Sequence, residues 1–171
     1  MIINSEDLKI RPHTKRKFSL QEDYSDTFLE GVGGSFKEPV QVAITIENDG
    51  QMLTGKGFVR TVINLVCSRC LKDIEYQVNA PLNVIIKGTA GAAEGPSKEA
   101  EPYLLEINYN GDVDLNSGVE EAILFNLPLI PLCSDNCLGL CSGCGADLNT
   151  QKCRCEQPDI DPRWQKLKEL K

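Results

Sequence analysis

The chain has 171 residues, 41% of them apolar, and a formal net charge of −7 at pH 7. This length predicts one domain of moderate size with an additional segment, and no run approaches the roughly 18 apolar residues that a membrane-spanning helix needs. The acidic balance excludes a pull of the whole molecule toward nucleic acid, so any such contact has to be local. The first ten residues carry charge and hold no apolar export signal. They therefore predict a cytoplasmic, reducing location.

The segment from Lys9 to Lys17 contains five basic residues and no acidic one. Two interpretations stay open: a patch that binds RNA phosphates through Lys15, Arg16 and Lys17, or a solvated strand or loop. The single histidine, His13, lies in this arm, far in sequence from every cysteine pair. We expect His13 to be solvated.

The middle of the chain has the alternating pattern of β-strands. From Val40 to Glu47, valine and isoleucine occupy every second position, which is typical of a half-buried strand. A second extended run follows from about Met52 to Val66, and a third alternates from Ile74 to Ile86. The loop between the second and third runs holds Cys67 and Cys70, so this cysteine pair is predicted at the tip of a hairpin.

Residues 88–101 are predicted to form an acidic loop with too little apolar content to pack. A helix is predicted at 117–127, since Ser117 and Glu120 form a capping-box pattern and Pro128 ends the run. A second helix is predicted to start at Asp161, with Trp164 packed on the domain.

These elements predict an α+β fold, in which an antiparallel β-sheet or partly open barrel is covered by a helix. Residues 1–132 are expected to form the β-rich core. Residues 133–171 are expected to form a cysteine-rich, zinc-binding segment whose short C-terminal helix packs on that core.

Eight cysteines are present, and six of them lie between Cys133 and Cys155. In a reducing compartment, paired cysteines at CxxC spacing bind metal more often than they form stable disulfides. Eight thiolates make two sets of four, which predicts two tetrahedral zinc sites of structural type. Four thiolates also accept iron, and one zinc with four buried thiols is the alternative count.

The spacing of the cysteines suggests how they divide. Cys141 and Cys144 form one CxxC pair, and Cys153 and Cys155 lie two apart, so an eight-residue loop closes one local site. By subtraction, the second site takes four residues that are distant in sequence: Cys67, Cys70, Cys133 and Cys137. Its metal would join the C-terminal segment to the earlier β region.

Coordination by four thiolates leaves no open position for a metal-bound water, so we expect no metal-dependent catalysis. The sequence also lacks a serine, histidine and acid set and a phosphate-binding glycine loop. We therefore expect no enzymatic activity and no small-molecule substrate.

Four features together resemble a known family. They are the CSRC loop after a strand, the segment FNLPLIPLCSDNCLGLCSGCGADLN, the CRC pair and the terminal DPRWQKLKEL. They are similar to the bacterial YceD family, the large ribosomal RNA subunit accumulation proteins, over about the last two thirds of the chain. Some members lack the Cys141 to Cys155 cluster and keep ligands near Cys133 and Cys137, which supports the division by spacing.

The resemblance implies a non-enzymatic role in the accumulation of 23S rRNA and in large-subunit assembly, through precursor rRNA or assembling particles. Zinc would then order loops whose cations meet phosphates. Besides those of the basic arm, these candidate cations are Arg69, Lys72, Lys152, Arg154 and Arg163. For Arg69, a hydrogen bond that caps a zinc-bound sulfur or a carboxylate is the alternative.

Two other functions stay open. A protein adaptor that binds a basic ribosomal protein suits an acidic molecule. A redox protein would use the CSRC or CSGC pair as a reactive dithiol, which requires one pair to be free of metal.

Overall fold

The computed structural model describes residues 1–50, 52–87, 103–106 and 111–155. The chain divides into two compact units. The sheet unit consists of Met1–Leu65 and Ile74–Leu129, and the cysteine unit consists of Val66–Asp73 and the chain from Ile130 onward. The acidic loop predicted at 88–101 and the helix predicted from Asp161, with Arg163 and Trp164, lie outside the described residues.

The main sheet has the strand order β2-β4-β5-β6-β7, in which β7 is the short strand Tyr103–Glu106. Its long strands are β2 (Lys15–Glu22), β4 (Val40–Asn48), β5 (Leu53–Val66) and β6 (Asp73–Lys87). β2, β4 and β5 pair antiparallel, and the loop 67–72 joins β5 to β6 as a hairpin. The order has two free ends, so the described part of the sheet is open. The α+β class with an antiparallel sheet is confirmed, and the barrel form is not adopted.

One face of this sheet forms the core, and the alternation read from the sequence predicted it correctly. In β4, Val40, Val42, Ile44 and Ile46 are all buried. In β6 the buried positions run from Val78 at every second residue to Ile86. These side chains form one cluster with Val59, Ile63 and Leu65 of β5.

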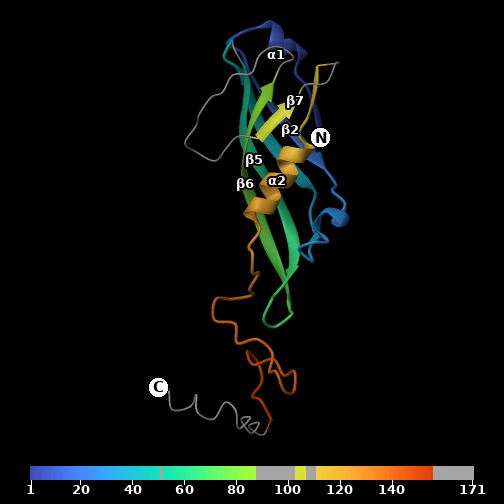
Figure 1. Ribbon diagram of the computed structural model, residues 1–171, viewed down its shortest axis with the longest axis vertical. Helices are drawn as coiled ribbons and strands as arrows, with labels where there is room; N and C mark the ends of the chain where they lie inside the picture. The colour runs from blue at the N-terminus through green and yellow to red at the C-terminus, as the bar shows by residue number, and fades with distance from the viewer. Residues whose placement is uncertain (51, 88–102, 107–110, 156–171) are drawn as a thin grey trace, which may run out of the picture. The chain divides into compact units, whose positions relative to one another are not determined.

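α2 (Asn116–Asn126) covers the core face of the sheet (Figure 1). Val119, Ala122 and Ile123 of this helix are buried in the same cluster as the strand residues. The helix was expected at 117–127 with a capping box, and the cap is wrong. Asn116 is already helical, so α2 begins before the predicted cap residue, and a leucine side chain at Leu115 has no atom that could cap it. The Leu115 amide donates to the Met1 carbonyl at 2.9 Å, which holds the start of the helix. The Asp114 carboxylate instead accepts from the Asn116 amide at 2.9 Å.

Several short elements were not predicted. β1 (Ile2–Asn4) pairs antiparallel with β8 (Asp112–Asp114) in a separate two-stranded sheet. α1 (Glu6–Ile10) ends within the basic arm, and the arm's Lys15–Lys17 segment is the start of β2. The remaining pieces are η1 (Asp26–Leu29), β3 (Ser35–Phe36), which pairs with β5, and β7 (Tyr103–Glu106), which adds to β6 in parallel.

Candidate metal centre

The CSRC loop brings two sulfurs together by a tight backbone turn. The Cys67 amide donates to the Lys72 carbonyl at 2.8 Å, and the Leu71 amide donates to the Cys67 carbonyl at 2.9 Å. Leu71 takes a positive φ of 58°, which reverses the chain before β6 begins. Cys67 and Cys70 are both buried as a result.

The segment after Ile130 lies against this loop within the cysteine unit. The Ser68 amide donates to the Pro131 carbonyl at 2.9 Å, and the Leu140 amide donates to the Arg69 carbonyl at 3.1 Å. Between these two contacts, Cys133 and Cys137 reach the CSRC sulfurs. Gly139 permits the approach, because its φ is 77° and a Cβ there would lie 3.0 Å from the Arg69 carbonyl oxygen.

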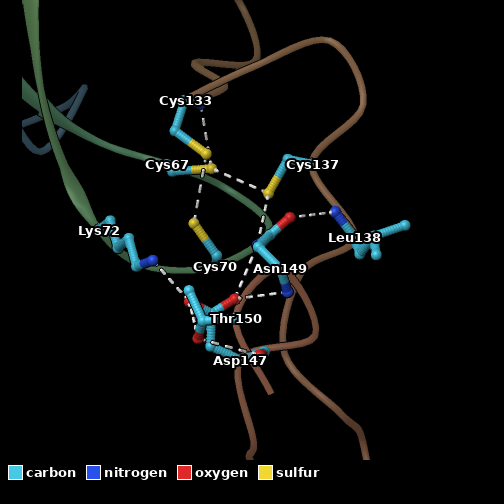
Figure 2. Close-up of polar contacts among 9 residues, drawn as sticks. All are labelled: Cys67, Cys70, Lys72, Cys133, Cys137, Leu138, Asp147, Asn149 and Thr150. Carbon is cyan, nitrogen blue, oxygen red and sulfur yellow. Dashed lines mark hydrogen bonds and ion pairs between the residues drawn. The ribbon is translucent and has the colours of Figure 1, made fainter. Parts of the chain in front are cut away.

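The first quartet is Cys67, Cys70, Cys133 and Cys137 (Figure 2). The sulfurs of Cys67 and Cys137 are 3.9 Å apart, those of Cys70 and Cys133 are 3.5 Å apart, and all four lie within 4.8 Å of one another. A regular tetrahedron with metal–sulfur bonds of about 2.3 Å needs sulfurs about 3.8 Å apart. The quartet therefore has the size of a four-thiolate metal site.

The second quartet is Cys141, Cys144, Cys153 and Cys155, and its sulfurs also lie within 4.8 Å of one another. Its CxxC turn is closed by the Cys141 amide, which donates to the Ala146 carbonyl at 2.8 Å, and by the Gly145 amide, which donates back to Cys141. The Cys141 sulfur is 3.2 Å from that of Cys153 and 3.8 Å from that of Cys155. The division of the eight cysteines by spacing thus matches the two clusters of the structure.

Polar groups around the first quartet hold its sulfurs in place. The Cys133 amide donates to the Cys67 sulfur at 3.4 Å, and the Asn149 amide nitrogen lies 3.5 Å from the Cys137 sulfur (Figure 2). Hydrogen bonds of this kind orient a thiolate and favour its charged form. The cysteine spacing did not predict that Asn149 contacts the first quartet. A D-x-N sequence after a CxxCG turn is the signal that could have indicated it.

Asp147 holds two residues that lie beside the first quartet. Its carboxylate pairs with the Lys72 ammonium at 2.6 Å, beside the first quartet, and accepts from the Asn149 side chain at 2.7 Å. The hydrogen bond from Lys72 is the main reason that the pKa of Asp147 falls to about 2, and the same contact raises the pKa of Lys72. The sequence had not singled out Asp147 either.

The acidities of the thiols fit a cation at the centre of each quartet. The backbone amide of Cys70 lowers the pKa of Cys67 to about 6, and that of Cys144 lowers the pKa of Cys141 to about 6. The Cys137 sulfur raises the pKa of Cys133 to about 12, and the Cys144 sulfur does the same for Cys155. One thiol in each quartet is thus hard to ionise beside its neighbours, and a divalent cation would favour its thiolate form.

The two quartets differ in their exposure to solvent. In the first, Cys67, Cys70 and Cys137 are buried and only Cys133 is exposed. In the second, Cys144, Cys153 and Cys155 are exposed and Cys141 is partly buried. Both could hold a metal ion.

The candidate RNA-binding cations fall into both units. In the sheet unit, Lys15 pairs with Glu47 at 2.9 Å, and Arg16 lies 3.4 Å from Asp7 and over the ring of Phe18. Lys17 is exposed on the same strand. Within the described residues no helix is long and apolar enough to cross a membrane.

In the cysteine unit, two of the candidate cations make contacts within the unit and two are exposed. Arg69 donates to the Cys137 carbonyl at 2.8 Å, so its guanidinium caps a backbone oxygen instead of a sulfur or a carboxylate. Lys72 pairs with Asp147, whereas Lys152 and Arg154 are exposed.

The chain is similar to proteins of mycobacteria and plants. A family model described as "Large ribosomal RNA subunit accumulation protein YceD" matches residues 55–171. An uncharacterized protein of Mycobacterium tuberculosis is 32% identical over 123 residues, which cover 72% of this chain and 56% of that protein. One of Mycobacterium leprae is 27% identical over 83% of this chain and 64% of its own length.

A chloroplastic protein of Arabidopsis thaliana, named as a large ribosomal RNA subunit accumulation protein YCED homolog, is 22% identical over 78% of this chain and 49% of its own length. The chain thus spans about half to two thirds of the length of the curated relatives that it matches. No solved structure matches it.

Proposed function

Since the chain belongs to the YceD family, we propose that it is a ribosome biogenesis factor that promotes accumulation of 23S rRNA and assembly of the large subunit in the cytoplasm. The observation that best supports this proposal is the family match over residues 55–171, a range that includes both cysteine quartets. The plant relatives are named for large ribosomal RNA subunit accumulation, and the proposal extends that role to this chain.

Zinc is the metal that we propose for both quartets. Four thiolates at tetrahedral spacing are the usual donors of structural zinc, and thiolate ligands do not favour magnesium or calcium. Zinc bound there supplies a cross-link between segments that are distant in sequence. In the first quartet, this cross-link holds the β5–β6 loop to the segment that carries Cys133 and Cys137.

A non-enzymatic role is consistent with both quartets. Four cysteine ligands fill a tetrahedral site and leave no position for an activated water. His13, the residue best suited to proton transfer at neutral pH, is exposed and lies in the sheet unit, whereas both quartets lie in the cysteine unit. The proposed action is therefore binding.

We propose direct contact with precursor rRNA or the assembling particle. In the cysteine unit, Lys152 and Arg154 are exposed next to the second quartet and suit phosphates. Arg69 and Lys72 support the fold of that unit through Cys137 and Asp147, so their contribution to RNA contact would be secondary. Arg163, which lies outside the described residues, remains a proposed contact from the sequence.

A protein adaptor is the second candidate, and two observations favour it. The net charge of −7 suits a basic ribosomal protein. Phe125 and Leu129 are also 78% and 101% exposed at and after the end of α2. A ribosomal protein as partner would keep the same role in subunit assembly.

Crosslinking separates these two modes. A tagged copy of the protein is crosslinked to RNA by ultraviolet light in growing cells, and the recovered RNA is sequenced. The proposal expects enrichment of precursor 23S rRNA over 16S rRNA and loss of mature 23S rRNA when the protein is depleted. Unchanged 23S levels on depletion would overturn the function, whereas loss of 23S without crosslinks would favour the adaptor.

A further inference from the structure

The sheet has a second face, opposite the core face, that α2 does not cover. Its side chains come from alternate residues of neighbouring strands, and the cross-strand partners Lys17 and Thr45, Ser19 and Ala43, and Gln21 and Gln41 are set by the β2–β4 register. The β4–β5 register continues these rows to Lys56, Phe58 and Arg60. We call this surface the open face.

Phe58 lies in the middle row of the open face and is 52% exposed. Lys56 and Arg60 flank it on β5, each two residues away and therefore on the same face. Its cross-strand partner is Ala43, whose own partner on β2 is Ser19. Since both neighbours are small, one side of the ring has free space above the sheet.

The charges around Phe58 are mainly positive. Lys17 and Lys56 flank Thr45 in one row, which places them roughly 10 Å apart across two strand spacings. Neither lysine has an ion pair among the described residues. The Glu47 carboxylate on this face is paired with Lys15 at 2.9 Å. The open face therefore differs in sign from the whole chain, whose net charge is −7.

A pocket of about 410 Å³ adjoins Arg60, on the other side of Phe58 from Lys56 along β5. Its lining includes Arg60, Glu38 and the side-chain amides of Gln41, Gln77 and Asn79. The Arg60 guanidinium donates to the Asn79 side chain at 3.3 Å. Side-chain amides can both donate and accept, so they match the edges of unpaired bases.

We propose that the open face binds single-stranded RNA, with one base stacked on Phe58, phosphates at Lys17 and Lys56, and an adjacent nucleotide at the pocket beside Arg60. The inference rests on the proposed function and deepens it, because it names the RNA class and the surface. An exposed aromatic ring among cations on a sheet is the arrangement by which sheets recognise single strands. A duplex has no unstacked base to offer.

The exposed aromatic side chain of α2 lacks this setting. Phe125 is 78% exposed, but its helix has no basic residue and contains Glu120 and Glu121. Such surroundings repel a phosphate backbone. Phe125 is therefore a matched control for Phe58, since both are exposed phenylalanines of the sheet unit.

The test measures binding of a fluorescein-labelled 12-nucleotide single-stranded RNA of mixed sequence by fluorescence anisotropy, with the full metal-loaded chain. Phe58→Ala is expected to weaken binding about 5- to 150-fold, as loss of one stacked base does. Phe58→Trp should bind at least as well as the wild type, and Phe125→Ala should be unchanged. Lys17→Gln with Lys56→Gln should lower the slope of log affinity against log salt by about 1.4.

Each result has a defined meaning. Equal losses in Phe58→Ala and Phe125→Ala, or no loss in Phe58→Ala, would overturn the proposed surface. Stronger binding to duplex RNA or to a ribosomal protein than to the single strand would do the same. Failure of the proposed function can be told apart from failure of the proposed surface. The first would appear as unchanged 23S rRNA levels on depletion of the protein, and the second as unchanged oligonucleotide binding by the Phe58→Ala variant.

Discussion

The Arg69 guanidinium donates a hydrogen bond of 2.8 Å to the backbone carbonyl of Cys137. The donor and the acceptor both belong to the first quartet's loops. Arg69 lies between Cys67 and Cys70, and Cys137 is itself a member of the quartet. The arginine thus joins the two halves of the first quartet through the backbone, without a hydrogen bond to a sulfur. Its position inside the CxxC loop has a structural reason.

Arg69→Ala should destabilise the metal-loaded protein by about 1.5–3 kcal/mol, because a charge-assisted hydrogen bond is lost. Arg154→Ala is the matched control, since Arg154 is exposed beside Cys153 and Cys155. Urea unfolding followed by circular dichroism measures both. Equal midpoints for the two variants would contradict the role assigned to Arg69.

The two quartets should release metal in order of their exposure. Three sulfur ligands of the second quartet are exposed, whereas three of the first are buried and two accept hydrogen bonds from Cys133 and Asn149. A chelator in excess should therefore release one metal ion at least about tenfold faster than the other. A colorimetric zinc indicator follows the two phases.

Cys153→Ser should abolish the fast phase of metal release and leave the slow phase unchanged, since Cys153 belongs to the exposed quartet. A single phase in the wild type, or loss of the slow phase in this variant, would mean that exposure does not control release.

The Lys72–Asp147 pair should contribute to stability over a defined pH range. The folded pKa of Asp147 is about 2, below its unfolded value near 3.9, so its contribution is present above pH 4 and is lost as pH falls toward 2. The pKa of Lys72 is raised, so its contribution is lost only when pH rises above roughly 10.4. Asp147→Asn should lower the urea midpoint equally from pH 5 to pH 9.

The difference between Asp147→Asn and the wild type should narrow at pH 3. Protonation of the cysteine ligands acts on both proteins and so does not enter this difference. Asp135→Asn, at an exposed carboxylate between Cys133 and Cys137, should match the wild type at each pH. A difference that widens at low pH would refute the assignment.

The packing of α2 on the sheet predicts unequal effects at adjacent residues. Ile123 is fully buried, so Ile123→Ala should cost about 2–5 kcal/mol. Leu124 is 44% exposed, and Leu124→Ala should cost less than about 1 kcal/mol. Chemical denaturation gives both values, and similar losses at the two positions would place the wrong face of α2 against the core.

The parts of the fold that the sequence predicted depend on short-range patterns. The alternation from Val40 to Glu47 identified β4, and the CSRC loop between two strands identified the β5–β6 hairpin. The second cysteine cluster followed from spacing, because residues joined by one short loop lie close together, and the first was assigned by subtraction from the eight cysteines. The apolar stripe of α2 was equally local.

The parts that were missed depend on contacts between residues distant in sequence. Ile2 pairs with Asp114, and no pattern in either segment predicts that the two strands pair. Asp147 and Asn149 act through Lys72 and Cys137, which only the folded chain brings near. The capping box was wrong at a helix start that contacts the N-terminus: the Leu115 amide donates to the Met1 carbonyl, and the Asn116 side chain accepts from the Met1 amino group.

The most direct test of the account is the metal content of the protein, purified without chelator and measured by elemental analysis, beside two double variants. Wild type should carry about two zinc ions per chain, and Cys67→Ser with Cys70→Ser should carry about one, as should Cys153→Ser with Cys155→Ser. Absence of metal, or a content that neither pair of substitutions lowers, would contradict two independent four-cysteine sites.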